Sequence, residues 1–138
     1  MKYDDFKVGY QGKYTRTITE ELNKRFADVI GDYNPVHFDE ARMKKSIFGK
    51  RATNGFLTES TIAVALVEMF TSKESIIIAL KKEVTLLAPV FMGDTVTAIV
   101  TVSERIPEKK RLWCDVKIVN QDKKAVLTAK YLVKILEI

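Results

Sequence analysis

The sequence contains a single cysteine, Cys114, and a single histidine, His37. One thiol cannot form a disulfide within the chain, so a reducing cytoplasm is the expected compartment. The same scarcity excludes a cysteine-rich zinc site and a site built from several histidines of one chain. We therefore expect no metal in the site.

Long apolar runs are also lacking, and the first residues do not show the pattern of a signal peptide. The longest apolar segment, Thr61 to Phe70, is interrupted by Glu68 and is much shorter than the roughly 20 residues that span a bilayer. The N-terminus includes Asp4 and Asp5 and has no apolar stretch of the kind found in signal peptides. We therefore expect neither a signal peptide nor a membrane partner.

The composition fits one globular domain, which we expect to span residues 1–138 with a substantial core. Hydrophobic residues make up 46% of the chain, charged residues 30%, and the net charge is +5. The basic residues are scattered and no nucleic-acid-binding motif accompanies them, so nucleic acid is not an expected partner. The positive charge is compatible with an anionic ligand, although a surface rich in lysine explains it equally well.

The first half of the chain has mainly helical patterns. Residues 12–20 favour a short strand, and the apolar residues that follow recur at helical spacing between Thr19 and Gly31. Gly31 can end that helix in a left-handed conformation, and Pro35 disfavours its continuation. The segment from Gly31 to His37 is therefore predicted to be a loop.

Two further helices are predicted before the strands begin. A short one is expected near residues 39–45. A long one is expected from Phe56 to Phe70, with Asn54 as its N-cap. Glu59 and Glu68 are its only charges, and a helix that is apolar almost all round is usually buried.

The second half is predicted to form consecutive antiparallel strands, because apolar and polar residues alternate between short turn signals. One buried helix against such a sheet is an α+β arrangement. A strand–helix repeat and a glycine-rich phosphate loop are both lacking, which argues against a nucleotide-binding fold. The predicted strands are 75–87, 96–102, 112–119 and 127–135, and the turns are 92–94, 107–110 and 120–123.

Asp32 and His37 are the strongest candidates for chemistry. Histidine has an unperturbed pKa near neutrality, and a nearby carboxylate can set its tautomer or share a proton. A second interpretation is ordinary turn chemistry, because Asp32 and Asn34 can bond to the local backbone while Pro35 fixes φ. Gly55 is the next candidate, since it begins the long helix, where N–H groups lack intrahelical acceptors. Such a group can stabilise an oxyanion, or it can simply belong to a helix cap.

Three segments resemble the MaoC-like (R)-specific enoyl-CoA hydratases. Phe26 to Asp39, with its Gly-Asp-Tyr-Asn-Pro-Val-His core, looks like the signature of that family. Tyr3 to Gly9 resembles its N-terminus, and Leu87 to Val96 resembles its Pro-Val-Phe-x-Gly-Asp-x-Val segment. The resemblance covers nearly the whole chain.

The resemblance implies a hot-dog fold, in which an antiparallel sheet wraps around a long central helix. It also implies a cytoplasmic homodimer of fatty-acid metabolism that reversibly hydrates trans-2-enoyl-CoA to an (R)-3-hydroxyacyl-CoA. Asp32 and His37 would activate the water, Asn34 would orient the loop or the water, and the Gly55 N–H would stabilise the enolate. The resemblance implies no metal or redox cofactor. The CoA is part of the substrate and is not a cofactor of the protein.

The sequence departs from the family pattern at two positions. Asn54 stands where the family has a histidine, and Ala63 stands where hydratases of the polyhydroxyalkanoate pathway often have a serine. Two other functions for a hot-dog chain therefore stay open, a non-catalytic acyl-CoA-binding protein and an acyl-CoA thioesterase. The complete motif from Asp32 to His37 argues against the thioesterase.

Overall fold

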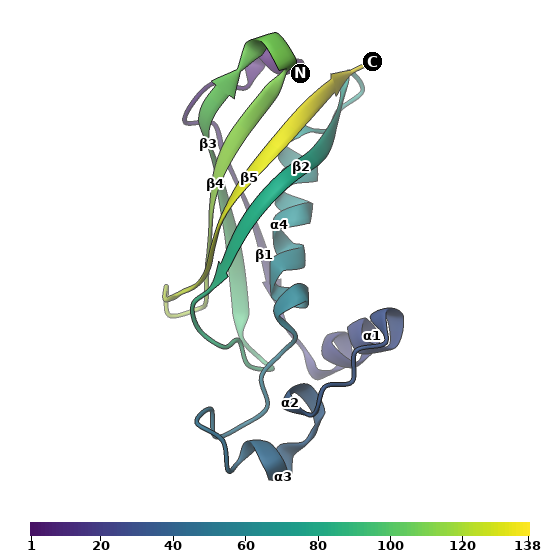
Figure 1. The fold of residues 1–138 in the computed structure, drawn as a ribbon, viewed down its shortest axis with the longest axis vertical. Helices are drawn as coiled ribbons and strands as arrows, with labels where there is room; N and C mark the ends of the chain where they lie inside the picture. Colours follow the sequence, from purple (N-terminus) through teal and green to yellow (C-terminus); the bar gives the residue numbers. More distant parts are fainter.

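The chain forms its helices before four of its five strands, as the sequence patterns predict. The structure is a computed structural model that describes residues 1–138 (Figure 1). Its elements are the 3-10 turns η1 (Tyr3–Asp5) and η2 (Pro107–Lys109), the helices α1 (Glu20–Ile30), α2 (Pro35–Phe38), α3 (Glu40–Met43) and α4 (Gly55–Phe70), and the strands β1 (Gln11–Thr17), β2 (Ser75–Leu86), β3 (Thr95–Ile106), β4 (Arg111–Val119) and β5 (Ala125–Glu137).

The five strands form one antiparallel sheet in the order β1-β3-β4-β5-β2. The predicted turns at 107–110 and 120–123 make the β3–β4 and β4–β5 hairpins, as expected. One expectation was wrong, because β2 and β3 are consecutive in sequence but not neighbours in the sheet. Strands β4 and β5 lie between them, so β2 becomes an edge strand that pairs only with β5.

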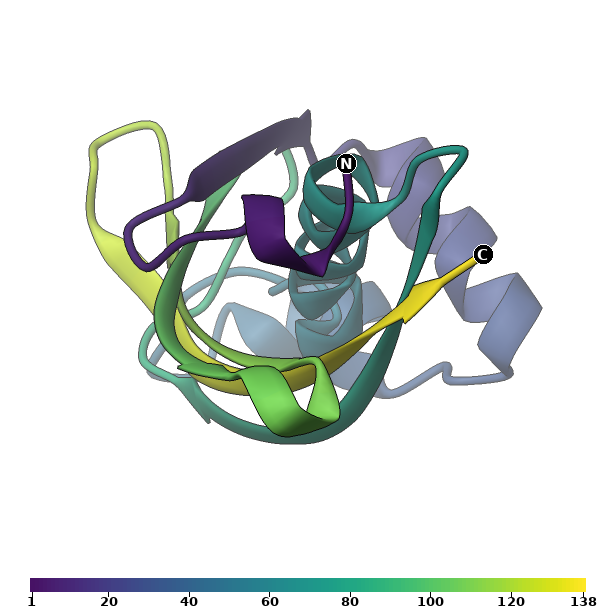
Figure 2. The same ribbon diagram turned by 90° about the horizontal axis from the view of Figure 1, so that it is seen from above.

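The sheet curves around α4, as Figure 2 shows in a view along the helix. The alternation in β3 is fulfilled, since Val96, Ala98, Val100 and Val102 are almost completely buried. From the helix, Leu57, Ile62, Ala65 and Phe70 enter the same core. This is the α+β arrangement that the sequence predicts.

The expectation that α4 is buried is met on the faces that pack against the sheet, but one side of the helix is exposed in the single chain. Phe56 and Val67 are 67% and 51% exposed, and Ala63 between them is also exposed. These residues are spaced by seven and four positions, so they form one stripe along the helix. The sheet covers the other faces of α4 and leaves this apolar stripe, which we call the α4 stripe, open.

Helices α1, α2 and α3 gather at one end of the sheet, beside the first turn of α4 (Figure 1). Both chain termini lie at the opposite end. The predicted loop from Gly31 to His37 is shorter than expected, because Pro35 begins the helical turn α2 instead of only ending a helix. Proline is favoured at the first helical position, since its missing N–H would be unpaired there anyway.

None of the helices is long and apolar enough to cross a membrane.

Cys114 lies in β4 and is completely buried in the core. Burial raises the pKa of its thiol to about 12, above the value of about 8.5 for an unfolded chain. The folded state therefore keeps the thiol neutral, and the contribution of this group to stability is lost as the pH rises from about 8.5 towards 12.

We predict that Cys114 in the folded protein does not react with a chromogenic thiol reagent at pH 8, because the thiolate is the reactive form and the side chain is inaccessible. The same reagent should label one thiol per chain after denaturation in urea, which is the internal control. Rapid labelling of the folded protein would contradict the packing described for β4.

Candidate active site

The candidate site begins where α1 ends. Gly31 adopts a left-handed conformation with φ 79°, as predicted, and its N–H donates to the Ala27 carbonyl at 2.8 Å. In the loop that follows, the Asn34 N–H donates to Asp32 Oδ1 at 3.1 Å. The Asn34 side chain in turn accepts a hydrogen bond from the Val36 N–H at 3.0 Å and caps α2. The turn chemistry considered for this segment is therefore present.

His37 projects from α2 and is 8% exposed. Its Nδ1 lies 2.8 Å from the carbonyl oxygen of Ala52. A carbonyl can only accept, so Nδ1 carries the proton and Nε2 of the neutral ring is left as an acceptor. The backbone of residue 52 thus fixes the tautomer that a general base would need.

Asn54 connects the loop to α4. Its Oδ1 accepts from the Phe56 N–H at 2.8 Å, which confirms its predicted role as the N-cap. Its Nδ2 donates to Asp32 Oδ2 at 2.8 Å. Sequence reasoning found the cap but missed the second contact, although a capping asparagine always has an amide group left to donate.

Gly55 is the first residue of α4, and its N–H donates no hydrogen bond within the chain. A Cβ placed on Gly55 would lie 3.2 Å from Leu86 Cδ1 at the end of β2. Glycine therefore suits this position because of the close approach of Leu86, and not because of an unusual backbone conformation. The result is a free donor at the positive end of a helix.

The structure brings the four predicted site residues together. Asp32, Asn34, His37 and Gly55 line one cavity of about 250 Å³, which is completed by Asn54, Phe56, Glu59, Val84 and Leu86. His37 and Gly55 also line a neighbouring cavity of about 340 Å³ with mainly apolar walls. The polar cavity therefore holds the groups with chemistry, and the apolar cavity beside it offers room for a hydrocarbon chain.

Glu59 is a residue of the cavity that sequence reasoning noted only as a charge in an apolar helix. It lies one turn after Gly55, and its side chain is 13% exposed. Its Oε1 accepts from the Tyr131 hydroxyl at 2.9 Å and pairs with Lys82 Nζ at 2.8 Å. Burial and this hydrogen bond raise the pKa of Tyr131. A charged residue at helical spacing from Gly55 was the available signal.

No group of three or more His, Cys, Asp and Glu residues is arranged to hold a metal ion.

The chain resembles known proteins over most of its length. A family model described as "MaoC like domain" matches residues 6–127. An (R)-specific enoyl-CoA hydratase from Rhodospirillum rubrum is 33% identical over 78% of this chain and 74% of its own. A 3-hydroxybutyryl-CoA dehydratase from Methylorubrum extorquens is 30% identical over 98% and 84%.

A solved structure has the same fold. The (R)-hydratase of Aeromonas caviae, described as involved in PHA biosynthesis, superimposes with a TM-score of 0.85 at 27% identity. The match covers 94% of this chain and 96% of that one. With the antiparallel sheet around α4, this similarity confirms the predicted hot-dog fold.

Position 54 offers a test of the double contact made by Asn54. In Asn54→Asp the carboxylate keeps the cap of α4 but faces Asp32 with a like charge. We expect Asn54→Asp to be less stable than the wild type at pH 7 and to recover as the pH falls towards about 4, where one carboxyl becomes protonated. Urea unfolding at both pH values measures this.

Asn54→Ala is the matched control. It loses the cap and should lose about 1 kcal/mol at both pH values without the recovery. Equal stability of Asn54→Asp and the wild type at pH 7 would show that the side chain at position 54 does not interact with Asp32.

Proposed function

Because the chain belongs to the family of MaoC-like domains, we propose that it is an (R)-specific enoyl-CoA hydratase, which also runs as an (R)-3-hydroxyacyl-CoA dehydratase. The observation that carries this proposal is the convergence of Asp32, His37 and the free Gly55 N–H on one cavity. Addition of water to an enoyl thioester needs a base near the water and an electron sink at the carbonyl, and these three groups can supply both.

In the proposed reaction, a water molecule lies between Asp32 and His37. Nε2 of His37 is the free acceptor of the ring and takes the proton of the water. Asp32 is held by the Asn34 N–H and the Asn54 amide, and it orients the water as a second acceptor. Asn34 helps to orient the water. Its Oδ1 is used to cap α2, but its amide Nδ2 has no acceptor within the chain and can donate to the water.

The water oxygen forms a bond to the β-carbon, and the electron pair of the carbon–carbon double bond moves towards the thioester carbonyl. The N–H of Gly55 stabilises the negative charge that develops on the carbonyl oxygen. The Asp32–His37 pair then returns a proton to the α-carbon, which completes the (R)-3-hydroxyacyl thioester. Every atom of the product comes from the substrate and one water, and no carbon changes its oxidation state overall, so the step needs no oxidant or reductant.

We predict that the protein removes the enoyl absorbance of crotonyl-CoA, and that Asp32→Asn and His37→Ala each reduce kcat by at least about 100-fold while the far-ultraviolet circular dichroism is unchanged. The rate loss follows because each variant removes one of the two groups that hold the water. Chiral analysis of the product should give the (R)-alcohol.

The control for this experiment is thiol release, measured in parallel with the same CoA ester. Wild-type protein that releases thiol without forming the hydroxyacyl product would support an acyl-CoA thioesterase instead. Binding of a saturated acyl-CoA without either reaction would support a non-catalytic binding protein.

A homodimer is the second part of the proposal. Strand β2 pairs with β5 on one side only, so the backbone groups of its outer edge are free to pair with another strand. Beside this edge, the α4 stripe of Phe56, Ala63 and Val67 exposes apolar surface. A second copy that adds its own β2 edge would cover both features, since soluble chains rarely leave an apolar stripe beside an open strand edge.

We expect Val67→Lys to shift the protein from dimer to monomer in sedimentation-velocity experiments, because it places a charge within the covered stripe, at its C-terminal end. Ile47→Lys is the matched control. Ile47 is 98% exposed in the loop after α3 and is not part of the stripe, so its substitution should leave the dimer intact. A wild-type chain that sediments as a monomer at micromolar concentration would rule out this assembly.

A further inference from the structure

We propose that Arg51 is a positioning residue for His37. It would hold the short helix α2 and, through the adjacent backbone, the ring of His37 in the orientation needed for proton transfer. The inference rests on the proposed function, because it concerns the alignment of the same catalytic group.

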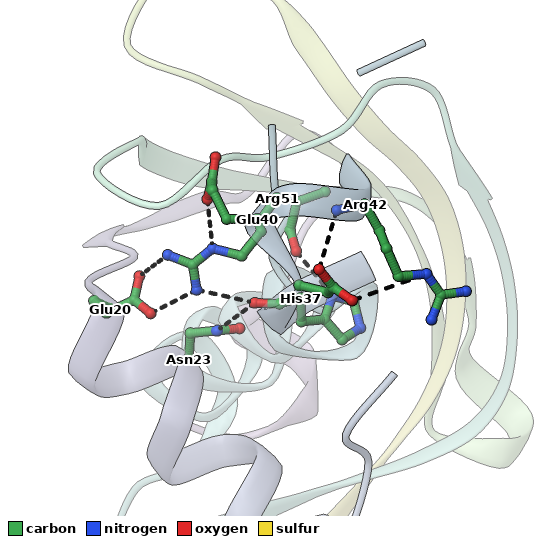
Figure 3. Close-up of polar contacts among 8 residues, drawn as sticks. Glu20, Asn23, His37, Glu40, Arg42 and Arg51 are labelled. Atoms are coloured by element: carbon green, nitrogen blue, oxygen red, sulfur yellow. Dashed lines mark hydrogen bonds and ion pairs between the residues drawn. The ribbon is translucent and has the colours of Figure 1, made fainter. Parts of the chain in front are cut away.

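Arg51 joins two helices through its guanidinium group (Figure 3). Its side chain is 20% exposed. Nη1 and Nη2 donate to the two carboxylate oxygens of Glu20, the first residue of α1, at 2.7 and 2.9 Å. Nε donates to Glu40, the first residue of α3, at 2.8 Å. The hydrogen bonds to Glu20 and Glu40 raise the pKa of Arg51, so this group stays charged.

The same guanidinium group reaches the main chain of α2. Nη1 donates to the His37 carbonyl oxygen at 3.3 Å, and the buried amide of Asn23 donates to that oxygen at the same distance. Helix α2 has only four residues, so most of its carbonyl groups accept no hydrogen bond from an N–H group of the same helix. Arg51 and Asn23 therefore supply from outside the restraint that α2 cannot supply itself.

The residue after Arg51 holds the ring. The Ala52 carbonyl accepts from His37 Nδ1 at 2.8 Å, and the Ala52 N–H donates to the Val36 carbonyl at 3.0 Å. Arg51 and Ala52 together thus contact the ring of His37, its carbonyl group and the carbonyl group before it. A displacement of Arg51 moves the peptide that sets the tautomer of the ring.

Only arginine can make these contacts simultaneously. Its planar guanidinium group presents five N–H donors in a fixed fork, and all three of its nitrogens donate here, to Glu20, Glu40 and the His37 carbonyl. Lysine carries one ammonium group and cannot reach three acceptors in this geometry. The two carboxylates are about half exposed, so we expect the network to act on alignment more than on stability.

Steady-state kinetics of Arg51→Lys and Arg51→Ala provide the first test. We expect kcat for crotonyl-CoA to fall by about 10- to 100-fold in both variants, the scale expected when a catalytic group loses its alignment, with KM changed by less than about threefold. The matched control is Arg25→Ala. Arg25 lies on the outside of α1 and forms one long ion pair with Glu21 at 3.9 Å, so its removal should leave kcat unchanged.

The second test does not depend on activity. His37 is the only histidine, so the ring resonances in a nitrogen-15 spectrum belong to it without ambiguity. The wild type should show the proton on Nδ1, and both Arg51 variants should show a mixture of the two tautomers. A wild type that forms no hydroxyacyl product contradicts the proposed function, while the tautomer comparison still decides the role of Arg51.

Unchanged tautomer and unchanged kcat in the Arg51 variants would overturn the inference. If Arg51→Ala fails to fold, Glu20→Gln decides the question in its place. It removes the charge that anchors the fork and leaves Arg51 itself, so we expect the same shift in tautomer with a smaller loss of kcat. A Glu20→Gln spectrum identical to that of the wild type would again overturn the role of Arg51.

Discussion

The packing of α4 against the concave side of the sheet is the interaction on which the rest of the structure depends. A helix with only two charges in sixteen residues has to be covered, and curvature of a five-stranded sheet around it meets this need. The same packing fixes where the first turn of α4 lies, at the end of the sheet beside α1 and α2 (Figure 1). The unpaired N–H group of Gly55 in that turn therefore lies at a cavity and not in open solvent.

Local features of the fold were predictable from the sequence, whereas the order of the strands was not. Alternation at Val96 to Val102 and turn residues such as Gly93 act over a few positions, so the sequence determines them directly. The pairing of β2 with β5 depends on contacts between residues about 40 to 60 positions apart, which no local pattern encodes. Pro35 was also ambiguous, because proline both ends helices and begins them.

The candidate site shows the same division. Asp32, Asn34, His37 and Gly55 were found because they stand in a motif or at a helix start, and they line one cavity. The contacts that hold them were missed, since Asn54 lies 22 residues from Asp32 and Arg51 lies 31 residues from Glu20. Turn chemistry and catalysis were considered as separate interpretations of the Asp32 segment. In the structure, the bonds that shape the turn are also those that orient Asp32, so both interpretations describe one arrangement.

The two contacts of Asn54 also limit which side chains this position can hold. Its planar end group has to accept from the main chain of α4 and donate to a carboxylate at the same time. Asparagine does this with the oxygen and nitrogen of its amide, and a neutral histidine can do it with its two ring nitrogens. The histidine that the resemblance leads one to expect at this position therefore has the same kinds of group as the asparagine of this chain, one acceptor and one donor, despite their different size and basicity.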